Sequence, residues 1–277
     1  MTNLTDNTVV ITGASRGIGE AAARQLAGLG ATVVLSARSA ARIEKIAEDI
    51  RTQGGHALTR RCDVSQEQDI AGLMRFAIDS TSRIDALINN AGIIEPIARL
   101  VESDPDEWSR VVDVNFKGVY YGLRHAIPHM LERGRGTVVN ISSGAATSAL
   151  EGWSRYCSTK AAVLSLTRCA HREYGDRGIR VIGLSPGTVV TQMQSQIKRS
   201  GINPVSRLDS SAHIPPEWVA RAIEFLLDKS SDAFLGTDFS LKTDEGRKAV
   251  GLPCLMICSA ILRRMQSLRA TSKWRAV

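Results

Sequence analysis

Long apolar runs, paired cysteines and a basic leader are all missing from this 277-residue sequence. No stretch reaches the roughly twenty apolar residues that a membrane-spanning helix needs, so we expect no spanning helix. The first residues, Met1–Asp6, hold neither a basic cluster nor an apolar segment, and we expect no secretory signal. The five cysteines form no Cys-x-x-Cys pair and are odd in number, a pattern typical of reduced thiols in a cytoplasmic protein.

Acidic residues are missing from the C-terminal end, and most of the net charge of +7 is therefore located there. Residues 252–277 contain five basic side chains and no Asp or Glu, so the preceding 251 residues carry only +2. No basic surface studded with aromatic residues accompanies this charge, and nucleic acid is not an expected partner. We therefore predict one folded domain over 1–251 and an atypical basic tail over 252–277. The short apolar run at 253–262 leaves membrane attachment of the tail as an alternative that we do not favour.

Short apolar segments alternate with segments of helical length from Thr8 to Leu241. The predicted strands cover Thr8–Ile11, Thr32–Ser36, Ala57–Arg61, Ala86–Asn89, Thr137–Ile141, Arg180–Leu184 and Phe234–Leu241. The predicted helices cover Ile18–Leu29, Ile43–Ile50, Gln66–Ser80, Asp106–Leu131, Ser154–Tyr174 and Pro216–Asp228. Strands that are apolar throughout and separated by helices predict a parallel sheet covered on both faces. The expected fold is therefore α/β, a doubly wound (Rossmann-type) parallel sheet of about seven strands in a single domain, with ligands bound at the carboxyl ends of the strands.

A glycine-rich turn lies between the first predicted strand and the first predicted helix. Gly13, Gly17 and Gly19 allow a tight turn and let backbone N–H groups approach a phosphate at the helix N-terminus. The spacing Gly-x-x-x-Gly-x-Gly differs from the Gly-x-Gly-x-x-Gly of the commonest dinucleotide folds, and no Gly-Lys-Ser/Thr ending marks a nucleotide hydrolase. The turn therefore predicts a dinucleotide site.

No acidic residue ends the second predicted strand, where an acid would accept a hydrogen bond from a ribose 2′-hydroxyl. Residues 36–39 read Ser-Ala-Arg-Ser, and a further arginine, Arg16, lies in the glycine turn. Two guanidinium groups, those of Arg16 and Arg38, near one ribose favour the 2′-phosphate of NADP(H). Asp63 and Val64, just after the third predicted strand, are expected beside the adenine.

Tyr156 and Lys160 are four residues apart on a predicted helix, which places them one turn apart on the same face. A phenol with a reference pKa near 10 is a poor base at neutral pH, but a nearby ammonium group and a cationic nicotinamide would both lower that pKa. Tyr156 would then exchange a proton with the oxygen of a carbonyl or alcohol substrate. Ser143 would donate a hydrogen bond to the same oxygen. The adjacent Ser142 competes for this role, and because neighbouring strand residues point to opposite faces we expect only one of the two to face the substrate.

Together these motifs resemble the short-chain dehydrogenase/reductase family over about Thr8–Leu241. The match consists, in order, of Thr12–Gly19, Asp63, Asn89-Asn90-Ala91-Gly92, Asn115, Ser143, Tyr156, Lys160 and Pro186-Gly187. The resemblance implies that Tyr156 is the acid/base and that Lys160 also binds the nicotinamide ribose. It further implies that Asn115 holds a water linking Lys160 to solvent, which makes Asn115, Ser143, Tyr156 and Lys160 the expected catalytic set.

The patterns and the resemblance also assign a cofactor surface and a substrate pocket. The expected cofactor residues are Gly13, Ser15, Arg16, Gly17, Ile18, Gly19, Arg38, Asp63, Val64, Asn90, Ala91, Gly92, Tyr156, Lys160, Pro186, Gly187, Val189 and Thr191. The expected substrate residues are Ile94, Ala145, Trp153 and Met193, which suggests a largely apolar pocket. The segment Thr188–Ile214 has weak periodicity, and we expect it to be a mobile loop over the substrate.

The sequence departs from the family at the end of the seventh predicted strand. Many members end this strand with Val-Asp-Gly-Gly, whereas residues 241–246 of this chain read Leu-Lys-Thr-Asp-Glu-Gly. Family members commonly form tetramers through the helices that match Asp106–Leu131 and Ser154–Tyr174 and through the C-terminal strand. Because that terminus is altered, we expect either a homodimer or a homotetramer.

The expected function is NADP(H)-dependent interconversion of a ketone or aldehyde and an alcohol by hydride transfer, in a dinucleotide-binding catalytic domain over 1–251. A 3-oxoacyl-thioester reductase is one subclass, and an NAD-dependent polyol or secondary-alcohol dehydrogenase is another. A non-catalytic dinucleotide-sensing protein is the alternative of a different class. No metal site is expected, since Pro128 disturbs the helix between His125 and His129 despite their i, i+4 spacing.

Overall fold

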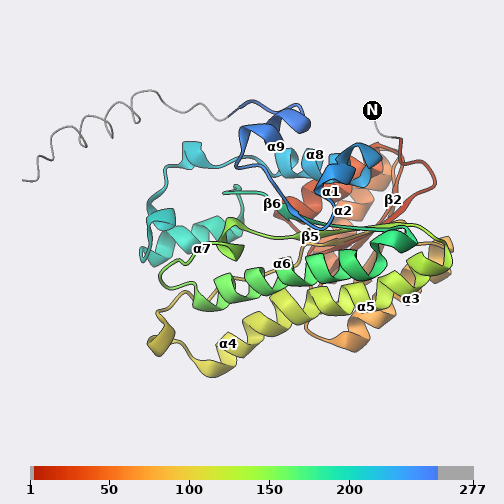
Figure 1. Cartoon of the computed structure of the whole chain (residues 1–277). Coiled ribbons are helices and arrows are strands. Elements are labelled where there is room, and N and C mark those ends of the chain that lie inside the picture. The colour runs from red at the N-terminus through yellow and green to blue at the C-terminus, as the bar shows by residue number, and fades with distance from the viewer. Residues whose placement is uncertain (1–2, 255–277) are drawn as a thin grey trace, which may run out of the picture.

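Seven parallel strands form one sheet in the order β3-β2-β1-β4-β5-β6-β7 in the computed structural model, which describes residues 3–254 (Figure 1). The strands are β1 (Thr8–Thr12), β2 (Thr32–Ala37), β3 (His56–Arg61), β4 (Ala86–Asn89), β5 (Gly136–Ile141), β6 (Ile179–Ser185) and β7 (Asp238–Ser240). Every neighbouring pair is parallel. The predicted fold class is therefore confirmed. Of the predicted basic tail, residues 255–277 lie outside the described residues.

Helices cover both faces of the sheet because successive strand residues point to opposite sides. Val9 and Ile11 of β1 belong to a core shared with α1 (Gly17–Gly28), α2 (Ala40–Thr52) and α8 (Pro216–Leu227). Val10, between them, belongs to a second core shared with α3 (Glu67–Thr81), α5 (Gly118–Glu132) and α6 (Ser154–Tyr174). Figure 1 shows the two helical layers on opposite sides of the strands. This double burial explains why the central strands β1, β4 and β5 are buried along their whole length, whereas the edge strand β3 carries exposed polar residues.

The strand order reverses at β1, because the chain builds outward to β3 and then crosses back to place β4 on the other side of β1. The loops that follow β1 and β4 therefore leave in opposite directions and open a crevice at the carboxyl edge of the sheet. The N-terminus of α1 and the loop after β4 border this crevice. Ligands of doubly wound folds bind at this point.

Two predicted elements differ from the structure. The single helix predicted over Asp106–Leu131 is divided into α4 (Pro105–Val112), a π-helical segment over Asp113–Lys117 and α5. The strand predicted over Phe234–Leu241 is reduced to β7, because its first residue ends a 3₁₀ helix and Gly236 turns the chain with a φ of +67°. A short helix, α9 (Asp244–Ala249), follows where the family pattern is lost. Over residues 3–254, no helix is long and apolar enough to cross a lipid bilayer.

Candidate active site

A cavity of about 1210 Å³ lies where the carboxyl ends of the strands meet the crevice. It is lined by every predicted cofactor and substrate residue except Gly19. Of the predicted catalytic residues, Ser143, Tyr156 and Lys160 line it, and Asn115 lies behind its wall. Packing requires a glycine at position 19, because a Cβ at this position would lie 2.6 Å from the carbonyl oxygen of Gly13. The absence of a side chain there lets α1 approach the end of β1.

The glycine turn has the shape that the phosphates of a dinucleotide require. Gly13 and Gly17 have φ angles of +66° and +57°, which favour glycine. A Cβ on Gly13 would lie 2.8 Å from Ala91 Cα, so this part of the turn has no room for a side chain. The N-cap residue of α1, Arg16, makes no side-chain hydrogen bond to the first turn of the helix. Since Gly17 and Ile18 line the cavity, the backbone at this helix N-terminus is available to a phosphate, and the residues present fit a dinucleotide cofactor.

Thr12 and Asn90 tie the glycine turn to the loop after β4. Asn90 Nδ2 donates to the carbonyl oxygens of Thr12 at 2.9 Å and Gly13 at 3.1 Å. Thr12 Oγ1 accepts from the backbone N–H groups of Asn90 at 3.0 Å and Ala91 at 3.1 Å. These four bonds fix the two walls of the crevice relative to each other. Thr12 was not among the predicted site residues, because its partners lie 76 residues or more along the chain.

Three arginines line the end of the cavity formed by β1 and β2. Arg38 follows β2, and Arg42 lies in the first turn of α2. Arg16 donates through Nη1 to Gln192 Oε1, at the start of α7 (Gln192–Ser200). Arg16 therefore links the glycine turn to a helix over the cavity. Arg42, which was not predicted, accompanies Arg38 after β2.

Tyr156 lies in the first turn of α6, buried against the cavity. Its burial raises the pKa of the phenol to about 12, and a hydrogen bond with Ser143 lowers this pKa by less. Ser143 Oγ accepts a hydrogen bond from Ala145 N–H at 3.1 Å, which leaves its own proton to be donated. Tyr156 therefore carries its proton at neutral pH. The lower pKa expected beside an ammonium group and a cationic nicotinamide concerns the site with cofactor bound and stays a prediction.

Lys160 is buried one turn further along α6. Its ammonium group donates to the carbonyl oxygen of Ile141 at 2.6 Å and lies 5.7 Å from the centre of the Tyr156 ring. Burial lowers the pKa of Lys160 to about 8, and the carboxylate of Asp238 opposes this shift. The structure thus places a positive charge beside the phenol, on the helix face expected from the spacing.

The adjacent serines Ser142 and Ser143 have different partners, as side-chain alternation along a strand predicts. Ser142 Oγ donates to Asp238 Oδ2 at 3.1 Å, whereas Ser143 is the serine hydrogen-bonded to Tyr156. Within the described residues, the other carboxylate oxygen of Asp238 has no hydrogen-bond partner. Burial raises the pKa of Asp238 to about 6, although Ser142, Lys160 and Arg168 each lower it. Nothing in the sequence indicated that this carboxyl group adjoins the site.

Asn115 is buried within the π-helical segment that joins α4 to α5. Its side-chain amide makes two hydrogen bonds to the backbone of Ile93. Oδ1 accepts from the N–H at 2.8 Å, and Nδ2 donates to the carbonyl oxygen at 2.8 Å. Nδ2 also lies 3.3 Å from Thr159 Oγ1. Single π turns inside helices occur frequently at functional sites, and this one places Asn115 against the loop that lines the cavity.

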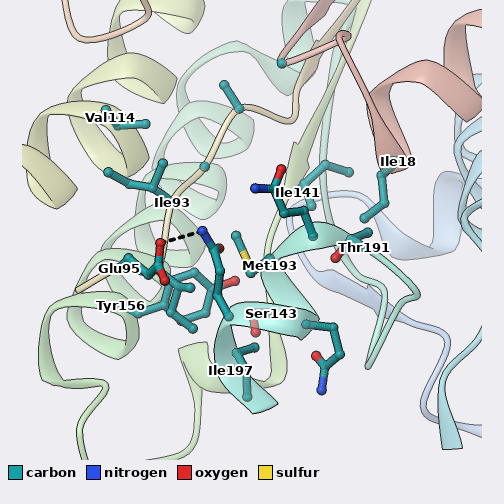
Figure 2. Close-up of a pocket in the computed structure, with 18 of the residues that line it drawn as sticks. Ile18, Ile93, Glu95, Val114, Ile141, Ser143, Tyr156, Thr191, Met193 and Ile197 are labelled. Atoms are coloured by element: carbon teal, nitrogen blue, oxygen red, sulfur yellow. Dashed lines mark hydrogen bonds between the residues drawn. The ribbon is translucent and has the colours of Figure 1, made fainter. Parts of the chain in front are cut away.

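The four predicted substrate residues gather around Tyr156. One buried apolar cluster, with its partly buried neighbours, contains Ile94, Ala145, Trp153, Tyr156, Ile197 and Met193. The Trp153 and Tyr156 rings meet edge to face with centroids 5.7 Å apart. Figure 2 shows Met193 and Ile197 on one helix, in the same part of the view as Ser143 and Tyr156. The space beside the phenol therefore has apolar walls.

Helix α7 occupies part of the segment Thr188–Ile214, which was predicted to be a mobile loop over the substrate. Gln196 Nε2 of α7 donates to Glu95 Oε2 at 2.5 Å, the bond dashed in Figure 2. Arg199 Nη2 lies 3.6 Å from Glu95 Oε1. Glu95, in the loop after β4, therefore connects two walls of the cavity, a role that sequence spacing did not reveal.

Comparisons with known proteins agree with this geometry. The short chain dehydrogenase family matches residues 7–201. The chain is 36% identical over 251 residues to cis-4-hydroxycyclohexanecarboxylate dehydrogenase of Sinomonas cyclohexanicum, which covers 88% of this chain and 98% of that protein. It is 32% identical over 236 residues to the 3-oxoacyl-(acyl-carrier-protein) reductase of Synechocystis sp., covering 85% and 94% of the two chains. A crystal structure of a variant of actinorhodin polyketide ketoreductase with NADPH matches with a TM-score of 0.80 and 26% identity, covering 87% of this chain and 97% of that chain.

The family match spans most of the chain, and the ordered motifs that it shares with the sequence lie in or directly behind the walls of one cavity. The protein therefore belongs to the short-chain dehydrogenase family, whose members are oxidoreductases that bind a nicotinamide dinucleotide and act on small molecules.

Proposed function

We propose that this oxidoreductase uses NADP(H) and interconverts a ketone and a secondary alcohol. The observation that carries the proposal is the meeting of Tyr156, Ser143 and Lys160 in the cavity that the glycine turn also lines. The choice of NADP(H) is supported by Arg38 and Arg42 after β2, where no acidic residue is available to accept from a ribose hydroxyl.

The role of each catalytic side chain follows from the proton that it can donate to the substrate oxygen. In reduction, Ser143 and Tyr156 donate hydrogen bonds to the substrate carbonyl oxygen, and these bonds strengthen as negative charge develops there. Tyr156 then transfers its phenolic proton to this oxygen, which leaves an alcohol and a phenolate. The raised pKa of Tyr156 ensures that this proton is present at neutral pH. When bound, the nicotinamide dinucleotide supplies the hydride for reduction or accepts it in oxidation.

Lys160 stabilises the phenolate that remains on Tyr156. An ammonium group 5.7 Å from the ring centre favours the negative charge, and the low dielectric of the buried site strengthens this interaction. The bond from Lys160 to the carbonyl oxygen of Ile141 holds the ammonium group on this side of the site. Asn115 supports the neighbouring loop, and we assign it the family's role of holding a water through which the phenolate regains a proton.

The walls of the pocket favour a ketone with an apolar body. Trp153, Ile94, Met193 and Ile197 offer few hydrogen-bond partners to the hydroxyl groups of a polyol. A relative that oxidises a substituted cyclohexanol supports a cyclic secondary alcohol. The similarity to a 3-oxoacyl reductase supports a 3-oxoacyl thioester as the second candidate.

Initial rates of NADPH and NADH consumption test this function. The substrates are cyclohexanone, butane-2,3-dione, a 3-oxoacyl thioester and a ketose. We expect the highest kcat/KM with NADPH and a cyclic or short-chain ketone, and no turnover by Tyr156→Phe despite intact cofactor binding. Cofactor binding without turnover of any ketone, thioester or sugar would favour the dinucleotide-sensing alternative, and substantial turnover by Tyr156→Phe would exclude the proposed acid.

A further inference from the structure

Lys242 reaches the cavity from the turn after β7, where the sequence departs from the family pattern. Its side chain extends past two glycines. A Cβ on Gly187 would lie 3.1 Å from Lys242 Cγ, and a Cβ on Gly144 would lie 3.2 Å from Lys242 Nζ. The aliphatic stem therefore lies along the residue after Pro186, and the ammonium group lies against the residue after Ser143.

The ammonium group is close enough to share a substrate with the catalytic serine. Consecutive α-carbons are 3.8 Å apart, so Lys242 Nζ lies within roughly 9 Å of Ser143 Cα, given its 3.2 Å distance from the Gly144 Cβ position. A small molecule with a carbonyl group at Ser143 and a second polar group a few bonds away spans such a distance.

No residue among those described neutralises the charge of Lys242. Within residues 3–254, Lys242 makes no ion pair and no side-chain hydrogen bond. The other cations that line the cavity beside the substrate residues are paired, because Arg110 lies 3.7 Å from Glu107 and Arg199 lies 3.6 Å from Glu95. The ammonium group of Lys160 donates a hydrogen bond to the carbonyl oxygen of Ile141. Among the described residues that line this part of the cavity, Lys242 is therefore the cation left for a ligand.

We propose that the natural substrate carries a carboxylate, which Lys242 binds while the reacting carbonyl lies at Ser143 and Tyr156. The inference rests on the proposed oxidoreductase function and adds the substrate class, an oxo acid or hydroxy acid with an apolar body. The apolar cluster around Trp153 receives that body. A single ammonium group is a compact point charge, which is sufficient to bind one carboxylate.

The test compares acids with neutral substrates of the same shape. We would measure kcat/KM for 4-oxocyclohexanecarboxylate and its methyl ester, and for 4-oxopentanoate and its methyl ester. The wild-type enzyme is expected to prefer each acid to its ester. Lys242→Gln is expected to lower kcat/KM for the acids by roughly tenfold, as loss of one charge-assisted hydrogen bond at an exposed site predicts, with little change for the esters. Lys242→Arg should retain the preference, and Lys242→Glu should reduce acid turnover further.

Lys248→Gln is the matched control, because Lys248 is an exposed lysine of α9 that does not line the cavity. It removes the same charge from the same region and is expected to leave the acid-to-ester ratio unchanged. Added salt should raise KM for the acids and not for the esters in the wild-type enzyme, and this difference should be absent in Lys242→Gln.

The outcomes separate this inference from the proposed function. Turnover of esters and acids with equal efficiency, or an equal loss on both in Lys242→Gln, overturns the carboxylate site while the oxidoreductase function stands. A loss in Lys242→Gln that appears as weaker NADPH binding identifies Lys242 as a cofactor contact and also overturns it. Absence of turnover with all four compounds and with the neutral ketone panel would instead count against the proposed function.

Discussion

Asn115 holds Ile93 by both of its backbone polar groups, with the side-chain oxygen 2.8 Å from the N–H donor and the side-chain nitrogen 2.8 Å from the carbonyl oxygen. Ile93 begins the part of the β4 loop that continues into Ile94 and Glu95 on the cavity wall. The geometry of one wall of the site therefore depends on a side chain that does not itself line the cavity.

Asn115→Ala should accordingly lower both stability and activity. Loss of the two hydrogen bonds to Ile93 is expected to cost about 1–3 kcal/mol of unfolding free energy and to lower kcat/KM through a displaced loop. Asn115→Asp keeps the acceptor for the Ile93 N–H and loses the donor to the Ile93 carbonyl oxygen, so its effect on stability is expected to differ in size from that of Asn115→Ala. Denaturant unfolding and initial rates on the same preparations measure both effects. An Asn115→Ala variant with unchanged stability and activity would show that the loop holds its position without the amide.

Most of the fold was predictable because the signals are local. The central strands are short runs of buried, mostly aliphatic residues, and the glycine turn and the Tyr156–Lys160 pair are contained within a few consecutive residues. The π-helical segment at Asn115 was not predictable, because α and π turns differ by one residue in their hydrogen bonding while the apolar face continues through both.

The remaining site residues could not be predicted from the sequence, because the topology of the fold brings them together. Lys242 meets Gly144 and Gly187 because β7, β5 and β6 end at the same edge of the sheet, and no spacing in the sequence encodes that meeting. Glu95 and Gln196 likewise come together from a loop and a helix that are 101 residues apart. Single charged residues of this kind look like ordinary surface side chains until the fold brings them together.

Ser143→Ala should reduce turnover much more than Ser142→Ala. Ser143 is hydrogen-bonded to Tyr156, and its hydroxyl is placed to donate to a substrate oxygen, whereas Ser142 donates to Asp238. Loss of one donor to a developing oxyanion is expected to lower kcat by about 10²–10³-fold. Single-turnover rates of the two variants provide the measurement. Equal losses would mean that the two serines exchange roles when substrate binds.

Asp238→Asn should move the alkaline limb of the reduction profile to lower pH. In the proposed mechanism the ammonium form of Lys160 acts beside Tyr156, and the pKa of Lys160 is about 8 because burial outweighs the opposing effect of the Asp238 carboxylate. Removing that carboxylate lets the pKa of Lys160 fall further, so the ammonium form is lost at lower pH. Profiles of kcat/KM from about pH 6 to about pH 10 report the inflection. Exposed Asp176→Asn, which removes an equal charge at a distance, is the control, and an unmoved inflection would mean that Asp238 does not act on Lys160.

The same substitution should change how stability depends on pH. The pKa of Asp238 is about 6 in the folded protein and 3.8 as the ordinary value, so the folded state binds the proton more tightly. The stability of the wild-type protein due to this group is therefore greatest below about pH 4 and falls as the pH rises to about 6. The decrease is at most about 3 kcal/mol, and we expect about 1–2 kcal/mol because the side chain is only partly buried. Urea unfolding of wild type and Asp238→Asn across this interval measures it, and identical pH dependence in both proteins would contradict it.

Arg38→Asp should reverse the cofactor preference rather than abolish cofactor binding. The aspartate repels the 2′-phosphate of NADPH and can accept a hydrogen bond from the 2′-hydroxyl of NADH. Loss of a charge-assisted bond of about 1.5–3 kcal/mol predicts a fall in kcat/KM with NADPH of about 10- to 100-fold, with a smaller change for NADH.

Arg42→Ala is expected to weaken the binding of NADPH and not that of NADH, because Arg42 lines the same end of the cavity. Arg75→Ala, on the exposed side of α3 and outside the cavity, controls for loss of a positive charge. Equal effects of Arg38→Asp on both cofactors would place Arg38 away from the ribose and remove the main argument for NADP(H).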